Sequence, residues 1–405
     1  MIRKFGLATV VAAVAFGAAG GLSAAEKKYG PGVTDTEIKL GQTVPYSGPA
    51  SAFSSYGRVM TGYVKMVNEA GGINGRKINL ISLDNAFSPP KAIEQTRKLV
   101  EDDGVLADVG TVGTTPNVAI QKYLNGAKVP HIFISAGGRR FADPQSFPWS
   151  VPMYPGFEME GKTFGQYIRK HKPAAKVAVL YQNDDYGKDF LVGLKATLGD
   201  KTKIVAEVAY EITEPTIDSQ IVRLKDSGAD TLLYFSTPKF TAQGLRKVKE
   251  TGWTPLQFLA SPTNSVKTVL EPAGFENAQG IITTQFTKQA GDPAWASDPE
   301  VTEYVEFMKK WVPSDNPGDF VALSGYINVQ GIVQAITKCG DDLTRENLLK
   351  QATNMKGTRF KMMLPGVQLN TTPQDYAPYE SLRMAKFEGS SWKLIEEPST
   401  SASAK

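Results

Sequence analysis

The stretch GTVGTTPNVAIQKYLNGAKVPHIFISAGGRR (residues 110–140) decides the fold class of this 405-residue chain. It contains two short apolar segments of strand type, and each ends in small residues, Gly-Thr-Thr at 113–115 and Ala-Gly-Gly at 136–138. Pro116 between them predicts the start of a helix. Neighbouring parallel strands end at one sheet edge, where open α/β sheets bind their ligands. We therefore expect both loops to contribute to one site, and their small residues and hydroxyls favour binding over catalysis.

The same alternation of strand and helix extends to both sides of this stretch. Apolar strand patterns precede it at 38–44 and 78–84, each followed by a helical pattern. After a proline-rich segment at 144–155, further strands are predicted at 177–181, 204–210, 231–235, 257–259, 281–286, 359–369 and 382–387. The alternation predicts an α/β fold with parallel, doubly wound sheets.

The length favours two domains over one. We expect lobe 1 to comprise 26–152 and 285–362, and lobe 2 to comprise 153–284 and 363–395. The serine-containing end, 396–405, is expected to be a mobile tail.

The first 25 residues have the pattern of a secretory signal peptide. Arg3 and Lys4 precede an apolar segment at 5–20, and small residues end in Ala25, after which cleavage is expected. A cytosolic N-terminal helix is the alternative. The signal predicts export to the periplasm.

Charge and composition exclude several functions. Two of the 45 basic residues lie in the predicted signal, so the mature chain has 43 basic and 41 acidic residues and a formal charge of +2. This balance gives no reason to expect nucleic acid or an anionic membrane as a partner. Cys339 is the only cysteine, so no internal disulfide can form. His131 and His171 are separate, without the spacing of metal ligands, and no cofactor or hydrolase motif occurs. We expect no cofactor, no metal and no catalysis, with a secreted hydrolase as a distant alternative.

Six segments together resemble the periplasmic solute-binding proteins of ABC importers for branched-chain amino acids and related solutes. They are TVPYSGPAS (43–51), VNEAGGINGRKI (67–78), LDNAFSPPKAIEQTRKLV (83–100), GTVGTT (110–115), ISAGG (134–138) and LYQNDDYGKDF (180–190). The resemblance implies two Rossmann-like lobes joined by three hinge crossings, near 151–155, 283–287 and 362–368. It also implies a monomer that closes on a solute and delivers it to a membrane permease.

The resemblance assigns the ligand carboxylate to the two loops of the opening stretch. Thr114 and Thr115 would hold it through hydroxyl and backbone N–H groups, as the start of a helix permits. The alternative is that these threonines only cap the helix. Ala136 and Gly138 would add backbone contacts. Arg139 replaces a small hydroxyl residue of the family, and either pairs with the carboxylate or is a solvated loop charge.

Four aromatic residues are expected to enclose the rest of the ligand, although ordinary core packing is the alternative for each. Phe53 and Tyr56 would close over it from lobe 1. Tyr186 would line the cleft from lobe 2, and Tyr154 lies on a predicted crossing.

The sequence departs from the amino-acid-binding members of the family in one informative place. Those members carry a carboxylate for the ligand ammonium after the strand corresponding to 257–259, whereas 260–264 here read Ala-Ser-Pro-Thr-Asn. Asp184 or Asp185 could substitute. Phe87 and Gly113 occupy the positions of the family's first-lobe disulfide. The missing acid and added arginine favour a small organic acid, such as an aromatic carboxylate, over an α-amino acid. An amino-acid-binding protein and a ligand sensor for a membrane receptor remain the alternatives.

Overall fold

The computed structural model describes residues 27–395 and 399–400. The predicted signal peptide and its cleavage site therefore lie outside the described residues, as does most of the predicted tail. Within that tail, the two-residue strand β15 (Ser399–Thr400) pairs with β13 (Ser381–Glu388).

The first lobe is built on a five-stranded parallel sheet with strand order β3-β2-β4-β5-β6. Its strands are β2 (Glu37–Val44), β3 (Lys77–Asp84), β4 (Ala107–Val109), β5 (His131–Ile134) and β6 (Ser150–Pro152). Its helices are α1 (Ser54–Glu69), α2 (Pro89–Arg97), α3 (Thr114–Gly126), α10 (Pro299–Trp311), α11 (Phe320–Cys339) and α12 (Arg345–Ala352). Strands β4 and β5 are buried along their whole length, as strands of a parallel sheet covered on both faces should be. A separate pairing of β1 (Lys28–Tyr29) with β12 (Asp342–Leu343) fixes the start of the described chain.

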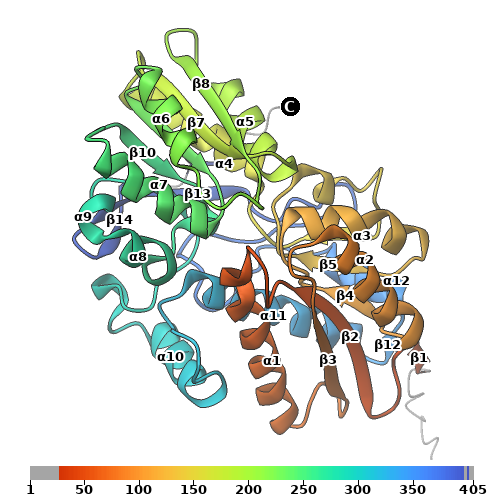
Figure 1. The fold of residues 1–405 in the computed structure, drawn as a ribbon. Coiled ribbons are helices and arrows are strands. Elements are labelled where there is room, and N and C mark those ends of the chain that lie inside the picture. Colours follow the sequence, from red (N-terminus) through yellow and green to blue (C-terminus); the bar gives the residue numbers. More distant parts are fainter. Residues whose placement is uncertain (1–26, 396–398, 401–405) are drawn as a thin grey trace, which may run out of the picture.

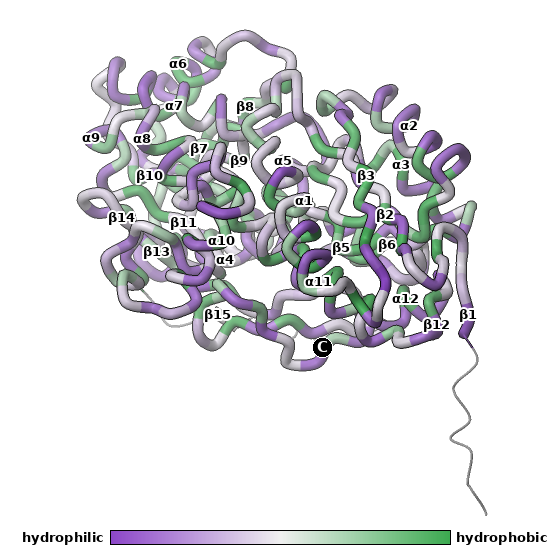
Figure 2. The backbone as a smooth tube through the Cα atoms, turned by 90° about the horizontal axis from the view of Figure 1, so that it is seen from below, coloured by the Kyte–Doolittle hydropathy of each residue, from purple (hydrophilic) through white to green (hydrophobic). Residues whose placement is uncertain are grey.

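The second lobe is built on a larger mixed sheet with strand order β14-β13-β11-β10-β9-β7-β8 (Figure 1). Its strands are β7 (Lys176–Gln182), β8 (Lys203–Tyr210), β9 (Thr231–Phe235), β10 (Leu256–Leu259), β11 (Ile282–Gln285), β13 and β14 (Ser391–Leu394). Its helices are α4 (Phe157–His171), α5 (Asp185–Thr197), α6 (Asp218–Asp226), α7 (Pro238–Glu250), α8 (Glu271–Ala273) and α9 (Phe275–Ala278). Strands β7 to β11 are parallel, whereas β13 is antiparallel to both of its neighbours. In Figure 2 hydrophobic residues concentrate along the strands, and hydrophilic residues along outer helical turns such as those of α2.

The chain passes between the two lobes three times: after β6, after β11 and before β13. Thr287 and Met363, on the second and third passages, form an antiparallel bridge. The α/β fold with two parallel-sheet lobes is the one that the sequence predicts. We propose that the lobe boundaries follow the passages, with 26–152 and 285–362 in one lobe and 153–284 and 363–395 in the other.

The segment 359–369 differs from the prediction of a strand. It forms turns, and its strand-type pairing is limited to isolated bridges of Met363 with Thr287 and of Leu369 with Thr358 and Tyr379. The physical reason lies in the backbone: Met362 has a φ of 74° and Gly366 a φ of 81°, and both values interrupt an extended strand.

Helix α11 forms the centre of the first lobe. It is the one helix of the described residues that is long and apolar enough to cross a membrane, but 78% of its most apolar window is buried in the protein. It packs against α1 and α12 and along β5. Cys339, at its end, is a free cysteine and is buried. The hydrophobicity of α11 is therefore explained by the core of the lobe.

Candidate functional site

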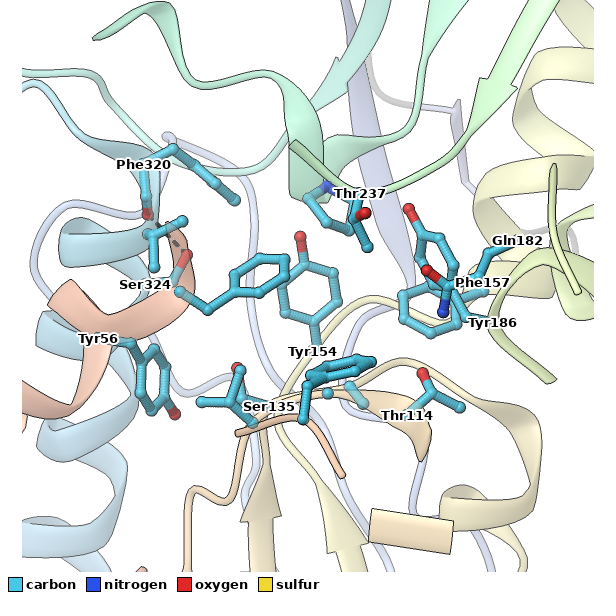
Figure 3. Close-up of a pocket in the computed structure, with 17 residues that line it drawn as sticks. Tyr56, Thr114, Ser135, Tyr154, Phe157, Gln182, Tyr186, Thr237, Phe320 and Ser324 are labelled. Atoms are coloured by element: carbon cyan, nitrogen blue, oxygen red, sulfur yellow. Dashed lines mark hydrogen bonds between the residues drawn. The ribbon is translucent and has the colours of Figure 1, made fainter. Parts of the chain in front are cut away.

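A solvent-open cleft of about 610 Å³ lies between the lobes, where the loops after β3, β4, β5, β6, β7, β9 and β10 face the first turns of α1 and α11. Its lining includes seven aromatic residues: Phe53, Tyr56, Phe87, Tyr154, Phe157, Tyr186 and Phe320. Its polar lining residues are Thr114, Ser135, Gln182, Thr237 and Ser324 (Figure 3). None of the lining residues carries a formal charge. Any charge on a ligand must therefore be held by neutral hydrogen-bonding groups.

The start of α3 forms one end of the cleft. Gly113 precedes the helix with a φ of 93°, and no side chain caps the first turn. A Cβ atom on Gly113 would lie 2.3 Å from the Phe87 ring, so a larger residue would not fit. The first N–H groups of a helix have no partner within it and carry part of its positive dipole. Together with the Thr114 hydroxyl, this end of the cleft suits a carboxylate.

A buried hydrogen-bond network holds the loop before α3 in place. The Asn117 amide donates to the carbonyl oxygens of Thr111 and Gly113, at 2.9 and 2.6 Å. The His131 ring lies 2.6 Å from the Asn117 side-chain oxygen, and the Thr111 hydroxyl donates to Asp108 at 2.8 Å. Burial lowers the pKa of His131 to about 3 and raises that of Asp108 to about 7. Neutral His131 thus has a positioning role, through Asn117, in the binding loop.

The aromatic wall is held rigidly by ring contacts and hydroxyl bonds. The Phe157 ring meets the Tyr186 ring edge-on, with centroids 4.9 Å apart. The Tyr186 hydroxyl donates to the Ser236 carbonyl at 2.9 Å, and the Tyr154 hydroxyl lies 3.1 Å from that of Ser261. Such a wall offers planar apolar surface at fixed positions.

Six of the nine residues predicted for the site line the cleft, and three do not. The lining residues are Phe53, Tyr56, Thr114, Ala136, Tyr154 and Tyr186. Thr115, Gly138 and Arg139 are absent from the lining. The Thr115 hydroxyl instead donates to Asp184 across the lobe interface, at 2.7 Å.

Arg139 is placed on the rim of the cleft, away from the lining residues. Its side chain is 64% exposed, and its nitrogen atoms lie 3.4 Å from Asp189 and 4.0 Å from Glu158. The short helix η3 (Arg139–Ala142) begins here, and the Arg139 backbone N–H donates to Asp189 at 2.9 Å. This turn directs the Arg139 side chain toward lobe 2. The hypothesis that Arg139 pairs with the ligand therefore has no geometric support.

The two acidic residues considered as ammonium partners also lie outside the lining. Asp184 caps α5 and accepts hydrogen bonds from Thr115 and from Gln182, the latter at 2.6 Å. Burial raises the pKa of Asp184, against the lowering effect of these bonds. Asp185 pairs with Arg140 at 3.3 Å.

Several lining residues were not predicted from the sequence. Ser135 and Gln182 lie inside the motifs ISAGG and LYQNDDYG, so their positions in those motifs were an available signal. Phe320, Val321 and Ser324 come from the first turns of α11, which Asp319 caps by accepting from the Val321 N–H at 3.1 Å. No local pattern indicates that this helix points into the cleft. Among the described residues, no group of three or more His, Cys, Asp or Glu side chains is placed to hold a metal ion.

Comparison with known proteins places the chain among binding proteins of this architecture. A family model described as "Periplasmic binding protein" matches residues 37–391. The Leu/Ile/Val-binding protein homolog 7 of Brucella suis biovar 1 (strain 1330) is 25% identical over 327 residues, which are 78% of this chain and 81% of that protein.

Solved structures share the fold. A branched chain amino acid ABC transporter protein from Thermus thermophilus with bound valine superposes with a TM-score of 0.82 at 18% identity, covering 91% of this chain and 98% of the other. A solute-binding protein of an ABC transporter from R. palustris, in complex with benzoate, has a TM-score of 0.75 at 17% identity, covering 90% and 98%. With the two-lobed fold, the interlobe cleft and a family match over 37–391, this chain belongs to the periplasmic binding protein family.

Proposed function

We propose that this protein is the solute-binding component of an ABC importer, and that its solute is a small organic acid of the aromatic carboxylate class. The observation that carries the proposal is the composition of the cleft, which seven aromatic side chains and neutral hydrogen-bonding groups line. The proposed partner is a membrane permease, to which the protein delivers its solute as a monomer.

The two charged groups of an amino acid would fare differently in this cleft. A carboxylate finds the Thr114 hydroxyl and the start of α3 at one end. An ammonium group finds no carboxylate among the lining residues, and burying a charge without a partner is costly. A planar ring gains contact with the edges and faces of Phe157 and Tyr186. This balance favours an acid without an amino group.

Relatives support both the proposal and its alternative. The R. palustris protein of the same fold is described with bound benzoate. The protein from Thermus thermophilus is described with bound valine, and the Brucella relative is named for leucine, isoleucine and valine. A branched-chain or other amino acid is therefore the second candidate.

A thermal-shift screen followed by calorimetric titration separates the candidates. A ligand that binds the folded state stabilises it by about 2.7 kcal/mol at a hundredfold excess over Kd. Benzoate-like and cinnamate-like acids should raise the melting temperature more than leucine or valine at equal concentration. Tight binding of leucine or valine, with no response to the aromatic acids, would reject the proposed solute class.

We also propose that residues 1–25 direct export and are removed after Ala25, so that the mature protein acts in the periplasm. Mass spectrometry of the periplasmic fraction should show a chain that begins at Glu26. Recovery of the full-length chain from the cytosol would contradict this.

The remaining alternative is a ligand sensor for a membrane receptor. Binding of the protein to a receptor in place of a permease would support that alternative.

A further inference from the structure

A second, much smaller cavity adjoins the cleft, with room for about one water-sized group, and we name it the annex. Ser135, Tyr154 and Ser324 line both the cleft and the annex, so these three residues form the boundary between the two spaces. Five residues line the annex but not the cleft: Met153, Phe286, Ile327, Asn328 and Tyr379. The annex therefore extends the cleft toward the hinge and the inner face of α11.

Asn328, which lines the annex, has a buried and unpaired acceptor. The residue is 3% exposed, and its amide nitrogen donates to the Phe133 carbonyl at 2.8 Å, which fixes the orientation of the amide. Phe133 has a φ of 55° at an irregularity in the pairing of β5 with β6, so its carbonyl is turned out of the ladder. The Asn328 side-chain oxygen has no hydrogen-bond partner among the described residues. A buried acceptor left unpaired costs about 1–3 kcal/mol, so a group that pairs with it on binding would gain that much.

Two hydroxyls around this acceptor already have protein partners. The Ser324 hydroxyl donates to the Phe320 carbonyl at 2.9 Å, which leaves its lone pairs for a ligand. The Tyr154 hydroxyl forms a hydrogen bond with the Ser261 hydroxyl. The buried Tyr56 hydroxyl, on the same side of the cleft in Figure 3, has no hydrogen-bond partner among the described residues. A neutral ligand hydroxyl, which can donate one hydrogen bond and accept others, fits this side.

The arrangement of the cleft predicts how a bound aromatic acid is oriented. Thr114 lies on one side of the cleft in Figure 3, while Tyr56 and Ser324 lie on the other. A carboxylate at Thr114 would leave the opposite edge of an aromatic ring facing Ser324 and the opening to the annex.

Building on the proposed function, we infer that the solute is a hydroxylated aromatic acid. Its ring hydroxyl, on the edge opposite the carboxylate, donates a hydrogen bond to the Asn328 side-chain oxygen at the annex. The chemical class is a phenolic acid with a benzoate or cinnamate skeleton. A site that pairs with a solute hydroxyl rejects the analogue without it, because the acceptor then stays buried and unpaired.

The deciding experiment compares three acids on the wild-type protein by calorimetric titration: benzoate, 4-hydroxybenzoate and 4-methoxybenzoate, with the cinnamate series in parallel. The hydroxylated acid should bind about 10- to 100-fold more tightly than the unsubstituted acid. The methoxy acid, which has no donor, should lose this gain. Equal affinity for the hydroxylated and unsubstituted acids would overturn the inference and leave the proposed function intact. Binding of leucine with no binding of any aromatic acid would reject the proposed function itself.

A variant assigns the preference to Asn328. In Asn328→Leu the hydroxylated acid should lose its advantage, so that the ratio of the two dissociation constants approaches one. The variant also loses the hydrogen bond from Asn328 to the Phe133 carbonyl, so the backbone there can shift. Such a shift affects the hydroxylated and the unsubstituted acid alike, and the ratio of their dissociation constants does not depend on it. Thr337→Val, on an exposed turn of the same helix, is the control and should keep the wild-type ratio. A preserved preference in Asn328→Leu would overturn the role of Asn328, and the wild-type comparison decides the solute class if this variant does not fold.

Discussion

At the scale of single residues, Arg139 and Thr114 should differ in how much they contribute to ligand affinity. Arg139→Ala should change the affinity for an aromatic acid by less than about threefold, because exposed ion pairs such as those with Asp189 and Glu158 contribute about 0–1 kcal/mol. Thr114→Val, which removes a lining hydroxyl while keeping its shape, should lower affinity by about tenfold or more. Calorimetric titration of the two variants tests this contrast.

A larger loss of affinity in Arg139→Ala than in Thr114→Val would show that Arg139 contacts the ligand. Loss of acid binding in Arg139→Ala with little effect of Thr114→Val would mean that the guanidinium swings into the cleft when solute binds. Arg140→Ala is a matched control, since Arg140 pairs with Asp185 on the same rim.

The residues of the site were predictable where a local motif fixes the backbone. Thr114 and Ala136 follow strands of a parallel sheet, so their place at the strand ends follows from the chain order alone. Arg139 shows the limit of such reasoning. Its side-chain direction depends on a 3₁₀ turn and on two carboxylates of the other lobe, which lie 19 and 50 positions further along the chain. Sequence spacing contains no information on either.

At the scale of elements, α4 and α5 pack so closely that glycine is required at their contact. A Cβ atom on Gly161 would lie 2.2 Å from the Phe190 carbonyl oxygen of α5. Gly161→Ala should therefore lower the free energy of unfolding by about 1–3 kcal/mol, as overpacking usually does. Gly126→Ala is the matched control, because Gly126 ends α3 and a Cβ atom there would have nothing within 4 Å of it. That variant should be neutral or more stable by up to about 1 kcal/mol. Equal urea midpoints for the two variants would contradict the close packing.

Helix α4 also has a buried carboxyl whose ionisation should affect stability. Glu160 accepts hydrogen bonds from the Ser261 N–H and hydroxyl, at 2.6 and 2.8 Å, and from the Thr284 hydroxyl at 2.8 Å. Burial raises the pKa of Glu160 from 4.5 to about 7, against the lowering effect of these bonds. The folded state therefore binds the proton more tightly than the unfolded state. The stability that this provides is complete below about pH 4.5 and is lost as pH rises through about 7.

Urea unfolding of wild type and Glu160→Gln between pH 5 and 8 tests this sign. The amide that replaces the carboxyl in this variant does not titrate, so the stability of wild type relative to the variant should fall with pH, by up to about 1.4 kcal/mol per unit. His131, whose pKa burial lowers to about 3, acts in the opposite direction but is present in both proteins and cancels. Parallel pH profiles would show that Glu160 does not titrate in this range.

The elements themselves differ in how well the sequence predicts them. Strands such as β5 and β9 are buried along their whole length and have continuous apolar runs, so their existence follows from composition. The contribution of α11 to the cleft cannot be predicted from composition. Its first turn reaches the site because the second passage between the lobes returns the chain to α1, a contact between residues more than 250 positions apart. Tertiary packing of this kind has no local signal.

At the scale of the whole molecule, hydrogen bonds join the lobes on both sides of the cleft. On one side the Thr115 hydroxyl donates to Asp184 of lobe 2 at 2.7 Å. On the other, Asp319 at the start of α11 accepts from Ser265 and Thr268 of lobe 2, at 3.2 and 3.3 Å. Contacts that exist only when the lobes approach favour the closed arrangement, and any solute that bridges the lobes shifts the same equilibrium.

Thr115→Val should therefore weaken the binding of every solute by one common factor, about 2- to 10-fold, because it reduces the closed population without touching the ligand. The loss should appear in the dissociation rate, measured by stopped-flow fluorescence. Asp184→Ala should be non-additive with Thr115→Val, with a coupling of about 1 kcal/mol in a double-mutant cycle, since both changes remove the same bond. If Thr115 contacts the solute directly, as the family resemblance implies, its replacement should weaken carboxylates selectively and should add to the effect of Asp184→Ala. The cycle thus distinguishes a residue that closes the protein from one that binds its ligand.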